Sequence, residues 1–321
     1  MKQTELIFCS DGIELVGVLY EPDDPASSTS GIVVCHSHFQ PKEGIDSRLA
    51  APLVDAGATV LSFDYRDTPA LNEPGQVRNM MEMDRVRDVR HALSCLSDRM
   101  ATKDVPLGLL GVSAGASTAI YAAAVDKRVA CTVALWPYGN GERWLRYARR
   151  LAEWEQLRAL IAEDWDRRAS GEAGHAIPCI ADEPGGVGIA FWELPEEAAR
   201  WATQIKSLPK ADCLVPLAAV ESCIEFVPED VVARISPRSI LLVAQTKSLA
   251  VPYWEEAHSL FQKAARPKGL AMVDVKSPWE LFDSPNLLND VVNASAAWFA
   301  RSGLFPSDRV DESVLRKLLV D

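Results

Sequence analysis

The sequence lacks any apolar run long enough to cross a lipid bilayer. A transmembrane helix needs about 20 consecutive apolar residues, and no segment of the 321-residue chain approaches that length. The first residues, MKQTELIFCSDG, also lack the apolar stretch of a secretory signal peptide. We therefore expect a soluble, cytoplasmic protein without a membrane partner.

Basic side chains are scarce relative to acidic ones. With 33 Lys and Arg residues against 45 Asp and Glu residues, the net charge is −12. Such a charge repels nucleic-acid phosphates and anionic lipids, which argues against nucleic acid as a partner. A small-molecule substrate is the partner that we expect, and a homodimer is compatible with the composition.

Paired cysteines and metal-ligand clusters are missing as well. The seven cysteines show no paired spacing, and Cys35, Cys95 and Cys131 lie in apolar runs, as buried reduced thiols do. His36 and His38 alternate on a predicted strand and share a face, but no third ligand stands at a recognisable spacing. No glycine-rich dinucleotide motif follows the first predicted strand. We therefore expect no metal and no cofactor.

The most informative motif that is present lies at residues 111–115, which read G-x-S-x-G with Ser113 at the centre. An apolar run over 105–110 precedes it and an Ala-rich stretch over 116–125 follows, and these predict a strand and a helix. Small residues around a serine on a sharp strand-to-helix turn expose its Oγ, the arrangement called a nucleophile elbow. Ser113 is therefore the first candidate catalytic residue.

The surrounding sequence predicts alternating strands and helices. Two alternating apolar runs within residues 4–20, joined by Ser-Asp-Gly at 10–12, predict a β-hairpin. Continuous apolar runs predict buried strands within 31–39, 59–66 and 239–244. Amphipathic segments between and after them predict helices over 45–56, 77–98, 115–126, 253–265 and 286–301. This alternation is typical of a mostly parallel sheet that is covered on both faces.

Together, these motifs resemble the α/β-hydrolase superfamily, in particular its lidded serine esterases and acyl hydrolases. The strand that runs into His36 is similar to the one that the family closes with H-G-x-x, and residues 64–66 resemble the D-Y-R ending of the next strand. The resemblance covers about residues 4–135 and 230–302. It implies an α/β-hydrolase fold, of the α/β class, with a mostly parallel sheet flanked by helices.

The same resemblance implies a helical lid, or cap, over 137–233, and a core domain formed by 1–136 and 234–321. Aromatic residues recur at helical spacing over 142–168 within the lid. Packing against the core is the favoured interpretation of each one. Some should nevertheless line the ligand cavity, because a lid in this place has the serine beneath it.

The chain departs from the family at two of the three catalytic triad positions. The family places an acid before the Val-Pro that follows the late strand, and a histidine in the loop after the last strand. The matching positions here are Ser248 and Pro278, and the last histidine of the chain is His258. Loss of a triad base costs on the order of a million-fold in turnover. The resemblance therefore implies a degenerate triad in which only Ser113 is retained.

Substitute groups are expected at the corner that follows the third strand. By position, the backbone N–H groups of His38 and Ala114 are the expected oxyanion donors. The His38 side chain is the candidate base, and a structural role for it is the open alternative. Ser37, which stands where the family has glycine, and Phe39 are expected beside them in the pocket. His36 belongs to the same candidate pocket, although a buried structural imidazole is the favoured interpretation of it.

Three classes of function fit these residues. The first is acyl hydrolysis or transfer on a small ester, thioester or related carbonyl substrate through Ser113 and a non-standard base. The second is a non-hydrolytic cyclase, lyase or isomerase of the same fold, and the third is an inactive ligand-binding homologue. Labelling by a fluorophosphonate separates them, because only an activated serine reacts.

Overall fold

The computed structural model describes residues 1–38, 46–68, 80–100, 104–147, 149–179, 189–191, 214–246, 253–275, 280 and 284–320. An eight-stranded sheet lies at its centre, in the order β1-β2-β4-β3-β5-β6-β9-β10. Its strands are β1 (Lys2–Ser10), β2 (Ile13–Glu21), β3 (Ser30–Cys35), β4 (Ala58–Phe63), β5 (Leu107–Val112), β6 (Val129–Leu135), β9 (Ser239–Gln245) and β10 (Lys268–Val273). From β4 to β10 all neighbours pair in parallel, whereas β2 pairs antiparallel with both β1 and β4.

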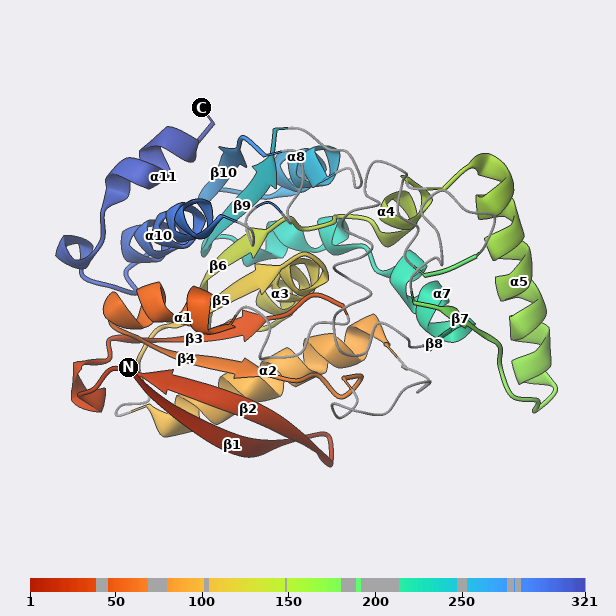
Figure 1. The fold of residues 1–321 in the computed structure, drawn as a ribbon, viewed down its shortest axis with the longest axis horizontal. Helices are drawn as coiled ribbons and strands as arrows, with labels where there is room; N and C mark the ends of the chain where they lie inside the picture. Colours follow the sequence, from red (N-terminus) through yellow and green to blue (C-terminus); the bar gives the residue numbers. More distant parts are fainter. Residues whose placement is uncertain are drawn as a thin grey trace.

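Helices cover both faces of this sheet (Figure 1). One face carries α1 (Asp46–Asp55) and α10 (Pro285–Arg301), which pack against each other and are followed by α11 (Glu312–Leu318). The opposite face carries α2 (Glu82–Arg99), α3 (Ala114–Val125) and α8 (Tyr253–Lys263). The α/β fold class predicted from the sequence is confirmed.

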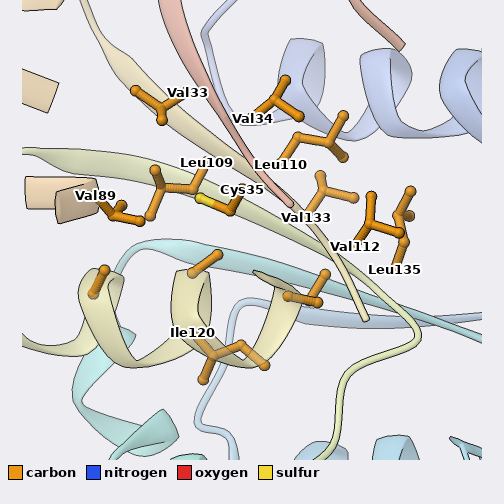
Figure 2. Packing of buried hydrophobic residues seen from close by; sticks show 14 of the residues in the cluster. Val33, Val34, Cys35, Val89, Leu109, Leu110, Val112, Ile120, Val133 and Leu135 are labelled. Carbon is orange, nitrogen blue, oxygen red and sulfur yellow. The ribbon is translucent and has the colours of Figure 1, made fainter. Parts of the chain in front are cut away.

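The burial of the strands explains their composition. β3, β4 and β5 are buried along their whole length, because helices lie on both sides of them, and they are almost entirely apolar. Figure 2 shows side chains of β3, β5 and β6 packed on one another, with Ile120 of α3 and Val89 of α2 among them. At the edge, β1 and β2 form the predicted hairpin. Asp11 and Gly12 form its turn, both with positive φ, as a two-residue type I′ turn requires.

The segment between β6 and β9 lies beyond the ends toward which the parallel strands point (Figure 1). It contains α4 (Gly141–Tyr147), α5 (Leu151–Ala169), α7 (Leu217–Glu225) and a small antiparallel sheet of β7 (Ala176–Pro178) and β8 (Leu214–Pro216). Two short 3-10 helices, η3 (Pro228–Asp230) and η4 (Val232–Ile235), return the chain to the sheet. The division into a core and a lid over 137–233 stays a prediction.

One prediction about the cysteines is wrong. Cys179, at the end of β7, is disulfide-bonded, whereas all seven cysteines were expected to be reduced. The spacing along the sequence could not reveal this, because disulfide partners are brought together by tertiary structure. Cys35, Cys95, Cys131 and Cys223 are free and buried, as expected of small apolar side chains. The cysteines therefore no longer argue for a reducing compartment.

Within the described ranges, no helix combines the length and the apolar character that a membrane span requires.

Helix α3 approaches the end of β3 very closely at Gly115. A Cβ atom on this residue would lie 2.1 Å from the carbonyl oxygen of Cys35 and 2.3 Å from that of His36. Backbone atoms on both sides leave no flexible group to move away. The glycine is therefore required for α3 to begin directly beneath the end of β3.

We predict that Gly115→Ala destabilises the protein by about 2–3 kcal/mol or prevents folding, because the new methyl group overlaps two carbonyl oxygens. Urea denaturation followed by circular dichroism measures the change. Val125→Ala, at the exposed end of the same helix, is the control and should stay within about 0.5 kcal/mol of the parent protein. Equal stability of the Gly115 variant would contradict the close approach.

Candidate active site

Ser113 occupies a strained turn between β5 and α3. Its φ of 53° and ψ of −122° lie in a region that non-glycine residues rarely adopt. Its backbone N–H donates to the carbonyl of Leu135 on the neighbouring strand, at 2.8 Å, which holds the turn against the sheet. The side chain is partly exposed, unlike those of its neighbours Val112 and Ala114. The role of Ser113 as a nucleophile stays a prediction.

The hydroxyl of Ser113 meets a tyrosine that the sequence patterns did not single out. Ser113 Oγ lies 2.9 Å from the hydroxyl oxygen of Tyr253, the first residue of α8. Burial raises the pKa of Tyr253 to about 12, although its hydrogen bond with Ser113 opposes this shift. At neutral pH, Tyr253 is therefore an uncharged phenol, which can donate or accept a hydrogen bond but does not act as a base. The only sequence feature that could have indicated Tyr253 is its position directly after Val-Pro at 251–252.

An ionic cluster with two buried carboxylates, Glu256 and Glu229, holds the helix that carries Tyr253. One turn further along α8, the buried Glu256 accepts hydrogen bonds from the backbone N–H groups of Gly139 and Asn140, at 2.7 and 3.1 Å. Arg143 of α4 donates to the same carboxylate through Nε at 2.5 Å. Its Nη2 donates to Glu229 at 2.8 Å. The cluster therefore ties α8 to the segment that follows β6.

Glu229 forms the outer part of this cluster. Burial alone would raise its pKa, but hydrogen bonds from Arg143, Ser259 and Lys263 outweigh it and hold the pKa of Glu229 at about 2. The carboxylate is therefore charged at any pH near neutrality.

The two histidines at the end of β3 point to different partners. His36 is buried, and its Nε2 lies 2.8 Å from the hydroxyl of Ser62 on β4, which fits the structural role favoured for it. His38 is also buried, and its Nε2 lies 2.7 Å from Oε1 of Glu82, the first residue of α2. Ser37, between them, is partly exposed. The sequence patterns did not indicate Glu82.

The ionised form of Glu82 is favoured. Burial would raise its pKa, but the nearby charge of His38 and the hydrogen bond to its ring, together with the charge of Arg85, hold the pKa of Glu82 below its usual value. His38 and Glu82 thus form a buried imidazole–carboxylate pair.

Aromatic rings from the segment after β6 surround His38. The centroid of the Phe191 ring lies 5.4 Å from that of His38, in an edge-on arrangement, and the Trp144 ring lies 6.1 Å away. Trp144 is stacked on Tyr138 at 4.8 Å. Two aromatic residues of the predicted lid therefore border the candidate base, which places an apolar wall beside the buried imidazole–carboxylate pair.

The remaining predicted positions take no part in these contacts or cannot be placed. Phe39, Ser248 and Pro278 lie outside the described residues. His258 is exposed on α8, within the described part of that helix. Among the residues that the structure covers, no three His, Cys, Asp or Glu side chains gather in a way that would hold a metal ion.

No protein-family profile matches the chain. The solved structure of the α/β hydrolase GrgF from Penicillium sp. sh18 superposes with a TM-score of 0.75 and 19% identity, covering 95% of this chain and 100% of that one. The chain has the α/β-hydrolase fold. The protein DcsB, solved with its substrate analogue, also superposes on this α/β-hydrolase fold, with a TM-score of 0.75, 16% identity, and coverage of 94% and 100%.

Two relatives with named activities resemble the sequence of this α/β-hydrolase-fold protein. The polyketide transferase grgF of a Penicillium species is 24% identical over 290 residues, which cover 87% of this chain and 90% of the relative. The polyketide transferase ATR5 of Stachybotrys chlorohalonatus is 26% identical over 272 residues, covering 83% and 86%. In sequence, the chain is therefore similar to polyketide transferases, and in structure it shares the fold of the α/β hydrolase GrgF.

We predict that Glu229→Gln lowers the free energy of unfolding by about 1–2 kcal/mol at pH 7, since Arg143 and Lys263 lose a charged partner that solvent only partly screens. The pKa of Glu229 is depressed in the folded state, so its stabilisation is complete above the ordinary value of 4.5 and is lost as the pH falls toward about 2. The gap between parent and variant should therefore shrink between pH 5 and pH 3.5.

Urea denaturation of both proteins at pH 7, 5 and 3.5 measures this gap. Glu142→Gln is the matched control, because Glu142 forms an exposed ion pair with Arg158 and should contribute less than about 1 kcal/mol. A gap that is absent at pH 7 would show that the cluster does not stabilise the fold.

Proposed function

We propose that this protein is an acyltransferase or acyl hydrolase that forms an ester between Ser113 and a polyketide-type acyl chain, with His38 as the base. The observation that carries the proposal is the placement of Ser113 on a strained turn at the start of α3, with a partly exposed hydroxyl. A strained serine in this position is the usual way in which an α/β sheet presents a nucleophile. The likeness to two polyketide transferases supports the acyl class.

The proposed reaction begins with attack of Ser113 Oγ on the carbonyl carbon of an ester or thioester. The new O–C bond forms while the hydroxyl proton passes to His38, and the carbonyl electrons move onto oxygen. The backbone N–H of Ala114, at the N-terminus of α3, has no intrahelical acceptor and is suited to the resulting oxyanion. As the intermediate collapses, the alcohol or thiol leaves with the proton from His38. Attack by an acceptor then reverses these steps.

The location of His38 supports its role as base. It follows β3, and the carbonyl of His36 in the same corner lies against Gly115 in the first turn of α3. The carboxylate of Glu82 lies at hydrogen-bond distance from Nε2, so that Nδ1 is the nitrogen proposed to exchange the proton. Aromatic walls from Trp144 and Phe191 keep this pair away from bulk water, which strengthens its electrostatic interactions.

Tyr253 is proposed to act as a hydrogen-bond donor. As a neutral phenol, it donates to Ser113 Oγ in the free enzyme, or to an oxygen of the substrate once Ser113 is engaged. The same contact also favours a second candidate function. A serine whose described partner is a phenol is suited to a non-hydrolytic cyclase, lyase or isomerase, in which both hydroxyls bind a carbonyl oxygen and no acyl-enzyme forms.

We predict that a fluorophosphonate probe labels the protein at Ser113 and that Ser113→Ala abolishes the labelling. His38→Ala should reduce both the labelling rate and the turnover of an acyl-N-acetylcysteamine thioester by about 10²-fold or more, because a general base contributes about 10² to 10⁴. Mass spectrometry of the labelled peptide identifies the serine. A folded protein that turns over the thioester without being labelled would favour the non-hydrolytic alternative.

We predict that Tyr253→Phe lowers kcat for the same thioester by about 10²-fold, as expected for the loss of one hydrogen-bond donor to a developing oxyanion. The ring packing remains, so the thermal midpoint should change little. Tyr121→Phe removes a hydroxyl from α3 while keeping the ring that stacks on Phe226, and it serves as the control. Unchanged turnover in the Tyr253 variant would leave its hydroxyl with a packing role alone.

A further inference from the structure

Helix α2 buries three charged side chains that are spaced three residues apart, namely Glu82, Arg85 and Asp88. Residues at this spacing lie near one another on a helix surface. Burying a charge is costly unless it is paired and hydrogen-bonded, so each of the three must have a partner in the fold. The partners show what this row of charges holds in place.

Asp88, the last residue of the row, binds groups at the edge of the sheet. Asp88 accepts hydrogen bonds from the hydroxyl of Ser10, at 2.6 Å, and from the guanidinium of Arg66, at 2.6 Å. The hydroxyl of Ser10 also lies 2.8 Å from Nδ1 of His91. Since Ser10 is buried and donates its proton to Asp88, this serine–histidine contact is structural and does not form a second nucleophilic site.

The other two residues hold the corner that follows β3. Arg85 donates to the backbone carbonyl of His36 at 2.8 Å, and its charge is neutralised by Asp67 at 3.0 Å. Glu82 binds the ring of His38 at 2.7 Å. Arg85 therefore binds the backbone and Glu82 binds a side chain of the same corner. The two residues are three positions apart on one helix.

We propose that Glu82 is a positioning residue that replaces the acid missing from the catalytic triad, by orienting His38 and stabilising its protonated form. This inference rests on the proposed function, in which His38 is the base. A carboxylate bonded to one imidazole nitrogen selects the tautomer in which the other nitrogen receives a proton. In the family the acid follows the late strand, where this chain has Ser248. Here it comes from the N-terminus of α2, on the opposite side of Ser113 in the sequence.

The surroundings of Glu82 suit this role. Its backbone N–H donates to the hydroxyl of Ser222 at 3.1 Å, which fixes the start of α2. The hydroxyl of Tyr138 and the thiol of Cys223 also face the carboxylate, and burial raises the pKa of each well above its usual value, so both stay neutral. The described charged groups around the pair are therefore Arg85 and Asp67, which neutralises it, together with Arg149, whose charge acts on Cys223.

The test compares Glu82→Gln with the parent protein, using an acyl-N-acetylcysteamine thioester as substrate. A glutamine keeps the size of the side chain but removes its charge, and its amide N–H group also stabilises the wrong tautomer. We expect kcat to fall by about 10²-fold or more, and the acid limb of the pH profile to move to lower pH. Glu82→Asp, which keeps the charge, should recover part of the activity and also provides a folded variant if the glutamine variant is unstable.

Asp126→Asn is the matched control, because Asp126 is a buried carboxylate paired with Arg128 at the far end of α3. This variant should keep turnover within about two-fold of the parent, whatever its stability. A comparable loss in both variants would show that neutralising any buried carboxylate impairs the enzyme, and would overturn the specific role of Glu82.

A second measurement does not depend on catalysis. The ring C–H signals of His38 are followed by NMR against pH in the Ser113→Ala background, with and without Glu82→Gln, and assigned with His38→Ala. We expect the midpoint of the titration to move to lower pH when the charge of Glu82 is removed. An unchanged midpoint and an unchanged pH profile would overturn the inference. If the midpoint shifts but His38→Ala leaves turnover unchanged, Glu82 is paired with His38 but His38 is not the base. That result would reject the proposed function and not the pairing.

Discussion

The contact between the first turn of α3 and the end of β3 sets the position of the turn that carries Ser113 relative to the corner after β3. Gly115 brings the helix against the carbonyl oxygens of Cys35 and His36, at distances that no side chain would allow. The same approach holds Ser113 in a strained turn, with its hydroxyl above the helix N-terminus and not inside the sheet. It also brings the third-strand corner beside the serine. The rest of the site is built around this contact.

Two sets of charges, each with a buried carboxylate, hold the corner after β3 and the helix that begins at Tyr253. On one side, Glu82 and Arg85 of α2 bind the ring of His38 and the carbonyl of His36. On the other side, Glu256 and Arg143 fix α8, which begins at Tyr253. A buried ion pair adds little net stability, because desolvation offsets most of its attraction. Its partners are nevertheless costly to separate, so these charges are better suited to fixing position than to stabilising the fold.

The chemistry proposed for the site follows from the contrast between its two sides. Burial keeps Tyr253 as a neutral phenol, since ionisation would place an unpaired charge in an apolar environment. Glu82 is equally buried, but the nearby His38 and Arg85 favour its charged form. Tyr253 therefore offers Ser113 a hydrogen-bonding phenol, and the corner after β3 is proposed to offer an imidazole–carboxylate pair. Such a division of roles is consistent with acyl transfer and with carbonyl chemistry that forms no acyl-enzyme.

Local patterns in the sequence were sufficient for the elements near Ser113. The G-x-S-x-G spacing, the apolar run before it and the Ala-rich stretch after it lead to β5, the turn and α3, because each depends on neighbouring residues only. Asp11 and Gly12 likewise determine the edge hairpin through their backbone preferences. The sequence also shows directly that no histidine follows His258, which favours the corner at His36 and His38 as the source of a base.

Tertiary structure alone decided which side chains complete the site. Tyr253 is 140 residues from Ser113 in the sequence and Glu82 is 44 from His38, so no local pattern links either pair. Glu82 also lies in a strongly charged helix, whose composition is that of a solvated surface element. Only its packing reveals that Glu82, Arg85 and Asp88 are buried. The disulfide at Cys179 was hidden for the same reason, because contacts between distant segments are set by how the chain folds and not by spacing.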